Sequence, residues 1–282
     1  MYQYNLVQWF LFFYFYCFCG WVWESCYVSV LKRHWVNRGF LHGPMLPIYG
    51  FGAVTILMLT IQVKENIALV FLLGMIGATI LEYVTGALME KLFHVRYWDY
   101  SNHKLNLNGH ICLACSIGWG FFSILLVEVL HTPVEGLILR IPMEYAVWIN
   151  AVISIVFTVD TALSVREALD LKELLKSMTQ NSQELQRLQK RIDVVLAFLE
   201  DDSGKIRERM GQSLEQIKMT AEMEGLKQEI ERLRKQGLPG RNQLYRQASR
   251  ILKRNPGSIS AKYKKALEDV KEAFEKKTEE KE

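Results

Sequence analysis

The sequence predicts an all-α membrane protein, a polytopic helical bundle of about five spans followed by a cytoplasmic coiled coil and a helical tail. Half of the 282 residues are hydrophobic, and most of these lie before residue 165. Their stretches are apolar on every face, whereas a soluble helix or strand alternates apolar with polar residues. The remainder is charged and helix-prone. We therefore expect a transmembrane domain over 1–165, a coiled coil over 166–236 and a tail over 237–282.

Five stretches are judged against the roughly 20 apolar residues that a bilayer core requires of a helix. The first stretch has no basic N-terminal region and no small-residue cleavage site, so we interpret it as a retained helix rather than a signal peptide. The predicted spans cover residues 6–30, 46–63, 67–89, 111–130 and 143–165.

The distribution of Lys and Arg predicts the orientation, because short cytoplasmic loops carry an excess of these residues. The loops after the first and third spans hold six of them, and the loops after the second and fourth hold two. We expect the N-terminus outside and the C-terminal tail in the cytoplasm. The tail is mildly basic but mixed in sign, which does not indicate a nucleic-acid partner.

The tail has the heptad pattern of a coiled coil. One register joins Leu171, Leu174, Met178, Asn181, Leu185, Leu188, Ile192, Val195, Leu199 and Ile206. A second, out-of-phase register joins Met223, Leu226, Ile230 and Leu233. Two arrangements remain open: self-association through the coil at 171–206, or a hairpin that folds back on itself.

Glycine and proline divide the rest of the tail. The stretch "GLPG" at 237–240 ends the second register, and a helix is predicted around 241–254. The turn "NPGS" then leads to a charged helix from about residue 259.

Cys112 and Cys115 form a C-x-x-C motif, with His94, His103 and His110 nearby. A metal or redox pair needs further ligands or a suitable context. The sequence holds no second C-x-x-C, so we interpret both cysteines as small packing residues and expect neither a metal site nor a cofactor.

Glu24 and Glu82 are the first functional candidates, because an ionisable residue inside a span is costly. Each lies eight residues, or roughly 12 Å, inside the predicted cytoplasmic end of its helix. Small residues share their faces, which permits close helix packing. If the two carboxylates meet, they should share a proton, a cation or a basic group such as Arg38. The alternative is that each carboxylate only bonds to a neighbouring helix.

The stretch "NRGFLHGPMLPIYGFGA" at 37–53 combines helix-breaking residues with the start of a span. Non-helical backbone at membrane depth persists only where protein buries it or water reaches it. We expect Gly43, Pro44 and residues 47–52 to form a broken segment beside Glu24 and Glu82, and therefore a polar cavity. The alternative is an ordinary helix with Pro47 in its first turn.

Two long stretches, "GWVWESCYVSVLKRHWVNRGFLHGPMLPIYGFGA" and "YWDYSNHKLNLNGHICLACSIGWG", resemble a bacterial family of membrane proteins. This is the family called Putative ABC-transporter type IV, or CmpB-like, and the resemblance extends to about residue 165. The residues that match its motifs are Glu24, Asn37, Arg38, Gly39, Gly43, Pro44, Pro47, Tyr49, Gly50, Trp98, Asp99, Asn108 and Gly109.

The resemblance implies a permease-like transport component of the bacterial plasma membrane. The chain has no G-x-x-x-x-G-K-[ST] motif, so any ATP drive would come from a separate ATP-binding subunit. We expect the motif residues and Glu82 to line a polar cavity on the cytoplasmic side, with no catalytic residues. One alternative is a membrane-embedded enzyme for a lipid or headgroup, using Glu24, Glu82, Asp99 and either His42 or His110. The other is a membrane-anchored coiled-coil scaffold or sensor.

Overall fold

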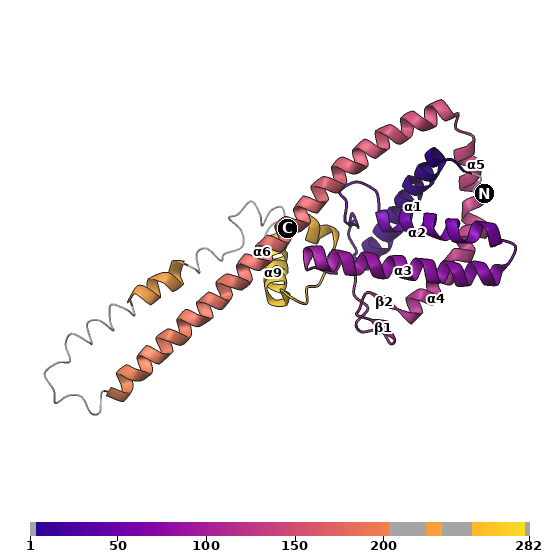
Figure 1. Cartoon of the computed structure of the whole chain (residues 1–282). Coiled ribbons are helices and arrows are strands. Elements are labelled where there is room, and N and C mark those ends of the chain that lie inside the picture. The colour runs from indigo at the N-terminus through magenta and orange to yellow at the C-terminus, as the bar shows by residue number, and fades with distance from the viewer. Residues whose placement is uncertain (1–3, 203–223, 233–249, 280–282) are drawn as a thin grey trace. The chain divides into compact units, whose positions relative to one another are not determined.

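The computed structural model describes residues 4–202, 224–232 and 250–279, and the chain is mostly helical (Figure 1). It divides into two compact units. The first unit comprises residues 1–172 with 247–262, and the second comprises residues 173–246 with 263–282. Residues 247–262 thus belong to the same unit as the apolar helices. The division into three domains at 165 and 236 remains a prediction.

Four helical segments in the described part are long and apolar enough to cross a membrane. They are α1 (Leu6–Lys32), α3 (Ile67–Phe93), the run from α4 (Leu113–Leu125) through a π-helical turn (Leu126–Leu130) to α5 (His131–Leu139), and the first part of α6 (Met143–Asp202). A shorter apolar helix, α2 (Pro47–Thr60), continues as a 3-10 turn over Ile61–Val63. The span count of five and the orientation remain predictions.

Capping residues set the ends of α1 and α3. Asn5 Oδ1 accepts a hydrogen bond from the Gln8 amide, and Gln8 Oε1 accepts one from the Asn5 amide, which forms a capping box at α1. Asn66 caps α3 through the amide of Leu69. The residue that follows each helix, Arg33 after α1 and His94 after α3, has a positive φ.

The expectation of a broken segment at 47–52 is wrong, and the alternative with Pro47 in the first helical turn is correct. Pro47 begins α2, where its fixed φ suits a helix and its missing N–H costs nothing. The irregular backbone is confined to the loop before it. Gly50 lies within α2 and does not break it. Its missing side chain leaves room for Cys17 and for the carbonyl of Phe13 on α1.

Two further features of the membrane region differ from the sequence prediction. The fourth apolar segment extends to Leu139 rather than 130, because a π-helical turn carries the helix past Pro133. The loop before it contains a short hairpin, β1 (Asn106–Leu107) with β2 (Ile111–Cys112), although only helices were predicted. Asn108 and Gly109, both with positive φ, turn the chain between the strands.

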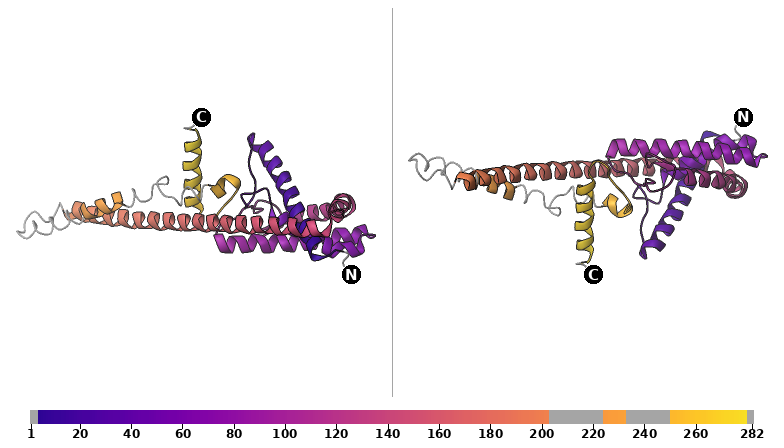
Figure 2. Two further views of the ribbon diagram at one scale, coloured as in Figure 1. Left: turned by 90° about the horizontal axis from the view of Figure 1, so that it is seen from above. Right: turned by 90° about the horizontal axis from the view of Figure 1, so that it is seen from below.

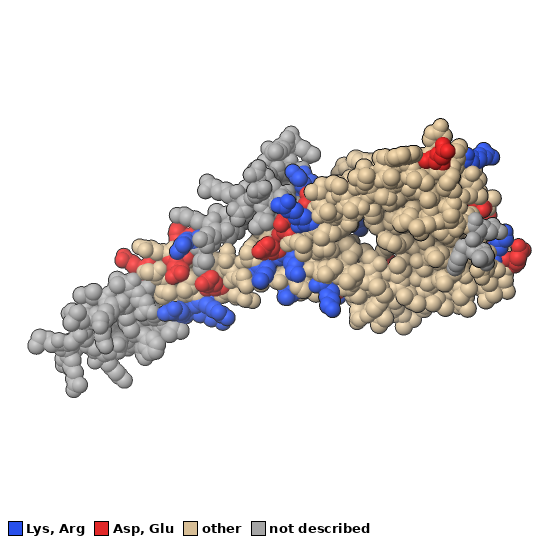
Figure 3. All heavy atoms as spheres, turned by 45° about the horizontal axis from the view of Figure 1, so that its top comes forward, with Lys and Arg blue, Asp and Glu red and all other residues tan. Residues whose placement is uncertain are grey.

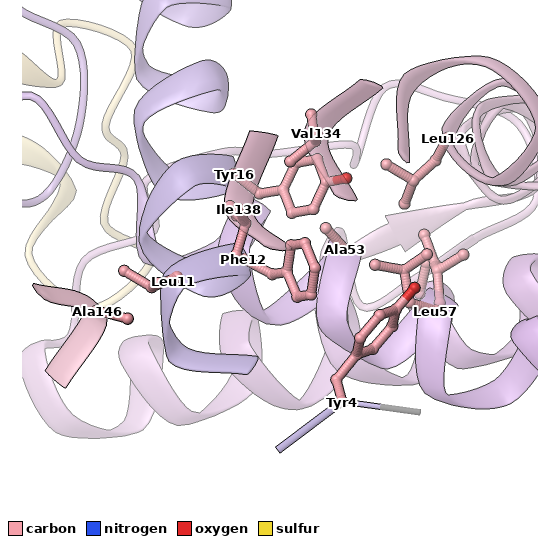
Figure 4. Close-up of a cluster of buried hydrophobic side chains, with 12 residues drawn as sticks. Tyr4, Leu11, Phe12, Tyr16, Ala53, Leu57, Leu126, Val134, Ile138 and Ala146 are labelled. Carbon is pink, nitrogen blue, oxygen red and sulfur yellow. The ribbon is translucent and has the colours of Figure 1, made fainter. Parts of the chain in front are cut away.

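Aromatic and aliphatic side chains fill the contact between α1, α2 and α5. Phe12 and Tyr16 of α1 lie among Ala53 and Leu57 of α2 and Ile138 of α5 (Figure 4). In Figure 2, α1 lies at a steep angle to α3. Figure 3 shows a broad surface of the first unit that is largely free of Lys, Arg, Asp and Glu, with these residues at its margins. This distribution fits a segment surrounded by lipid.

In the second unit, Leu188 of α6 and Leu226 of the helix over 224–232 form a buried cluster. Leu185, Ile192 and Ile230 pack against it, so residues of the two predicted registers meet within one chain. The coiled coil itself remains a prediction. Ile206, Met223, Leu233, "GLPG" and residues 241–249 of the helix predicted around 241–254 lie outside the described residues, as do the side chains of Val195 and Leu199.

The last predicted elements are only partly correct. The turn at 255–258 is confirmed by a hydrogen bond from the Ser258 amide to the Asn255 carbonyl. The charged helix α9 (Lys264–Glu279) starts later than residue 259, because Ile259 instead forms an antiparallel β-bridge with Arg96.

Candidate functional site

Glu24 of α1 is bound by groups from two other segments. Tyr49 of α2 donates a hydrogen bond from its hydroxyl to Glu24 Oε1 over 2.7 Å. Arg38 Nε lies 3.7 Å from Glu24 Oε2. Gly20, one turn before Glu24, leaves space for the Tyr49 ring, where any side chain would clash. The carboxylate is therefore positioned by α2 and by the loop between α1 and α2.

Arg38 also binds groups outside α1. Its Nη1 donates to Asn255 Oδ1 over 2.8 Å and lies 3.4 Å from the Arg254 carbonyl, and its Nη2 lies 3.3 Å from the Tyr97 carbonyl. Burial lowers the pKa of Arg38 from its ordinary value, and the Glu24 carboxylate opposes that shift. A guanidinium remains protonated under such conditions, so Arg38 brings a permanent positive charge to Glu24.

The motif loop at 37–46 is held by side chains as well as by its own backbone. Asn37 accepts from Trp21 Nε1 at 2.6 Å and donates to the His42 carbonyl at 2.8 Å. The amides of His42 and Gly43 both donate to the Asp160 carboxylate of α6, at 3.0 and 2.8 Å. These bonds satisfy backbone groups of an irregular segment beside the apolar helices, as burial requires.

His42 lies between two acidic residues of α6. Its Nδ1 is 2.9 Å from Asp160 Oδ1 and 3.0 Å from Ser164 Oγ, and its Nε2 is 3.0 Å from Glu167 Oε2. Arg254 Nη2 binds the same Glu167 oxygen over 2.9 Å. Ser164 and Asp160 approach the same ring nitrogen. A Ser–His–Asp triad instead requires them on opposite nitrogens.

Glu82 of α3 has different partners. It is 5% exposed and accepts hydrogen bonds from Trp119 Nε1 of α4 at 2.8 Å and from the Tyr100 hydroxyl at 3.0 Å. Burial raises the pKa of Tyr100, and the charge of Glu82 adds to this, so the phenol stays protonated and donates. No basic side chain of the described residues forms an ion pair with Glu82.

The second motif stretch shapes the hairpin beside Glu82. Asp99 Oδ1 accepts from the amide and hydroxyl of Ser101, and the Gly109 carbonyl accepts from the Tyr100 amide. Trp98 Nε1 donates to the His110 carbonyl at 3.0 Å, and Asn108 Nδ2 donates to the Tyr83 hydroxyl at 3.2 Å. These contacts place Tyr100 against Glu82.

Glu24 and Glu82 have separate partners, so the case in which the two carboxylates meet is not the one found here. The two residues are linked instead through a pair of aromatic rings: Tyr49, which binds Glu24, and Trp119, which binds Glu82, have ring centroids 6.3 Å apart. Of these two acids, Arg38 forms its ion pair with Glu24. The predicted residues thus fall into two neighbouring groups, one around Glu24 and one around Glu82.

The remaining predicted residues act through the backbone. Gly39 has a φ of 136°, a conformation that glycine adopts readily, and its carbonyl accepts from Asn255 Nδ2 at 2.9 Å. Pro44 lies in the motif loop and Pro47 opens α2. Gly50 allows α2 to approach α1 closely.

Several polar residues of the site were missed by the sequence prediction. Asp160 could have been found by the rule that selected Glu24 and Glu82, since it is also an acid inside a predicted span. Glu167, Arg254 and Asn255 gave no such signal, because they belong to the charged part of the chain. Tyr100 and Trp119 lie in the second motif stretch, but neither is charged, so the rule for acids inside spans did not select them.

The C-x-x-C motif lies at the start of α4. Cys112 caps the helix, and its sulfur is 2.8 Å from the sulfur of Cys115. His110, the histidine nearest to the motif in sequence, forms an ion pair with Glu90 instead, over 3.2 Å from its Nε2. Within the described residues, no three His, Cys, Asp or Glu side chains converge in a way that could hold a metal ion.

A family model described as "Putative ABC-transporter type IV" matches residues 11–165, which is more than half of the chain. The chain belongs to this family. The family match includes Glu24, the motif loop, Glu82 and Asp160, and it ends before Glu167 and Arg254. No curated protein and no solved structure matches the chain. The family and the apolar helices together identify an ABC-transporter-related membrane protein.

Proposed function

We propose that this chain is the permease-like component of a transporter in the bacterial plasma membrane and takes its ATP drive from a separate ATP-binding subunit. The observation that carries the proposal is the ion pair between Glu24, inside a membrane helix, and Arg38, on the irregular motif loop. Charged groups at this depth are costly and are retained where they contact a substrate or ion. The carboxylate and the guanidinium would bind polar groups of the substrate in a cavity on the cytoplasmic side.

The arrangement around this ion pair supports a site that can change shape. Its members come from α1, the motif loop, α2 and α6, joined by hydrogen bonds rather than by one rigid element. Tyr49 contributes from α2, and Asp160 holds the loop from α6. Transporters alternate access by moving helices relative to a polar site near the middle of the membrane. Glu82, with its own partners on α4 and the hairpin, would line the neighbouring part of the same cavity.

The geometry favours transport over the enzyme alternative. The enzyme alternative requires Glu24, Glu82 or Asp99 to act together with His42 or His110. His42 instead contacts Asp160, Ser164 and Glu167, and His110 forms its ion pair with Glu90. The scaffold alternative gives no role to Glu24 and Arg38, since an anchor needs no charge inside the membrane.

The proposal is tested by purifying the tagged full-length chain from its native membranes and reconstituting it in proteoliposomes. An ATP-binding subunit should co-purify, and the complex should hydrolyse ATP. Glu24→Gln should keep the subunit but reduce ATP hydrolysis about tenfold or more, because the residue would sense the transport site. The matched control is Glu144→Gln, an exposed acid at the start of α6, which should behave as wild type.

Each outcome decides between the proposed functions. A chain that purifies without an ATP-binding subunit, under conditions that preserve its fold, would contradict the transporter proposal and favour the enzyme or the scaffold. A complex whose ATP hydrolysis is the same for wild type and Glu24→Gln would mean that Glu24 is structural.

A further inference from the structure

A short segment of the tail, residues 250–260, lies against the family motif loop. We call this segment the clasp. It is some eighty residues away in sequence from the end of the family match, yet it belongs to the same compact unit as the apolar helices. Figure 1 shows it as the orange-yellow stretch before α9. The clasp forms hydrogen bonds with the motif residues Arg38 and Gly39 themselves.

Asn255 forms the centre of the contact. Its Oδ1 accepts from Arg38 at 2.8 Å, and its Nδ2 donates to the Gly39 carbonyl at 2.9 Å. It is 2% exposed, so both bonds are shielded from water. A single amide thus binds two consecutive residues of the motif loop.

Arg254 adds a buried ion pair. Its Nη2 lies 2.9 Å from Glu167 Oε2, and 3.3 Å from the Phe40 carbonyl. Glu167 also faces His42, so the same carboxylate joins the clasp to the motif loop. Arg250 approaches the other Glu167 oxygen at 3.6 Å, but its side chain is 66% exposed, and such a pair is weak.

The end of the clasp pairs with the chain that follows α3. Ile259 and Arg96 exchange two backbone hydrogen bonds, at 2.8 and 3.0 Å. Ser260 donates from its hydroxyl to the His94 carbonyl at 2.6 Å. The clasp therefore bridges the motif loop and the segment that leads to the hairpin beside Glu82.

Arg38 forms an ion pair with Glu24 and hydrogen bonds with the clasp. Its contact with Glu24 is 3.7 Å long, whereas its contact with Asn255 is 2.8 Å. A guanidinium can bind a carboxylate with two parallel hydrogen bonds, and that geometry is not reached here. Release of the clasp would free Nη1 of Arg38 for a substrate.

Two polar groups at the contact between the clasp and the first unit's loops lack hydrogen-bond partners among the described residues, which favours a contact that can open. The Tyr97 hydroxyl and Arg254 Nε are buried and have no hydrogen-bond partner among the described residues. Tyr97 and Arg254 interact electrostatically, and Arg38 binds the Tyr97 carbonyl. Buried polar groups without partners oppose the closed arrangement and lower the cost of opening it.

We propose that the clasp is an autoinhibitory element, which closes the tail-facing side of the Glu24–Arg38 site and must leave the motif loop before the site can work. The meaning of this closure for transport rests on the proposed function, but the closure itself does not. Regulatory elements of this kind act through two arrangements of similar free energy. In the closed arrangement, Asn255 and Arg254 hold the loop.

The first test is hydrogen–deuterium exchange of the full-length chain in nanodiscs, followed by mass spectrometry of peptides that cover residues 36–46. The variant is Arg254→Ala with Asn255→Ala, and the matched control is Arg250→Ala in the same segment. The amides of His42 and Gly43 should exchange about tenfold faster or more in the double variant. Arg250→Ala should match wild type, because its side chain is exposed.

The second test measures access to the carboxylates with a water-soluble carbodiimide. Glu24 should react about tenfold faster or more in the double variant. Glu82 should react at an unchanged rate, because its partners Trp119 and Tyr100 are not clasp residues. Equal rates for Glu24 in wild type and variant, together with equal exchange, would overturn the proposal.

A milder substitution provides a second variant in case the double variant does not fold. Asn255→Asp keeps an acceptor for Arg38 but removes the donor to Gly39, so it should raise exchange by less than the double variant. A fold that is intact by circular dichroism with no rise in either variant would contradict the clasp. Neither readout uses transport or ATP. If no ATP-binding subunit co-purifies but exchange rises, only the transporter proposal fails; if the subunit co-purifies and exchange is unchanged, only the clasp fails.

Discussion

Trp119 donates a hydrogen bond from Nε1 to Glu82 Oε2 over 2.8 Å, and this bond joins α4 to α3 at a carboxylate that is 5% exposed. Tyr100 donates to the other oxygen from the segment that precedes the hairpin. Three separate parts of the chain therefore meet at one side chain. Both donors are neutral, in contrast to the charged partner of Glu24.

Substitution of Glu82 should separate hydrogen bonding from charge. Glu82→Ala removes both acceptors and leaves two donors unpaired, which should lower the free energy of unfolding by about 1–3 kcal/mol. Glu82→Gln can still accept from Trp119 and donate to the Tyr100 oxygen, so its loss should stay below about 1 kcal/mol. Thermal unfolding in detergent measures both. A Gln variant as unstable as the Ala variant would show that the negative charge itself stabilises the fold.

Gly20 should be intolerant of a side chain. A Cβ at this position would clash with the Tyr49 ring, which must then move away from Glu24. Overpacking of this kind costs about 1–3 kcal/mol. Gly20→Ala should therefore lower the melting temperature, whereas Gly118→Ala, which meets nothing within 4 Å, should leave it unchanged or raise it slightly. Equal melting temperatures for the two variants would mean that α2 adjusts without cost.

The sequence indicated the helices and the positions of two acids within them, because both follow from hydropathy. Whole apolar stretches predict spans, and a charge within them is conspicuous. The same reasoning failed at Pro47, since a proline at the start of a helix and a proline that breaks one have the same neighbours in sequence. It also stopped the fourth segment too early, because a π-helical turn has no clear sequence signal.

The partners of the acids could not be predicted, because they are set by contacts between distant segments. Glu24 meets Arg38 and Tyr49 nearby in sequence, but Asn255 and Arg254 come from a charged tail whose pattern gives no indication of a binding partner. The Asn108–Gly109 pair is a hairpin signal, and the short strands beside it could have been predicted from it.

Acid should destabilise the loop between α3 and α4. Burial lowers the pKa of His110, and Arg96 adds to this, while Glu90 and Asp99 oppose it. Burial also lowers the pKa of His94, and Lys262 and Lys172 contribute. In each case the unfolded chain binds more protons than the folded one, so the stabilisation is present above pH 6.5 or so and is lost as the pH falls below it.

The measurement is the melting temperature in detergent at about pH 7.5 and about pH 5.5, on either side of the ordinary histidine pKa. His110→Gln should reduce the fall in melting temperature on acidification. His103→Gln, at an exposed position of the same loop, should show the same fall as wild type. If His110→Gln is as acid-sensitive as wild type, His110 does not contribute to the pH dependence.

The two arrangements of the tail predict different cross-links. Leu188 and Leu226 belong to one buried cluster within the second unit, as expected of a hairpin. In a chain whose five native cysteines are replaced by serine, Leu188→Cys with Leu226→Cys should form a disulfide within one chain on oxidation. Electrophoresis should show a monomer, and Leu226→Cys alone is the control. A dimer that depends on both cysteines would favour self-association through the 171–206 coil.

Cysteine labelling should establish the orientation, which the distribution of Lys and Arg predicts. In the cysteine-free chain, an impermeant maleimide should react in intact cells with a cysteine at Glu65 or Arg140, and with one at Ser101 only after permeabilisation. Arg140 is the right probe for the loop after the fourth segment, because α5 extends to Leu139. The result at Glu65 depends on α2, which has 14 residues and spans about 21 Å, less than the roughly 30 Å hydrocarbon core. Because α3 lies between them, Glu65 and Ser101 should lie on opposite sides whether or not α2 crosses the membrane. If α2 and its 3-10 turn cross, a cysteine near the N-terminus should react from the same side as one at Glu65. Reaction of these two cysteines from opposite sides would mean that α2 re-enters the membrane without crossing it, and that the number of spans is even.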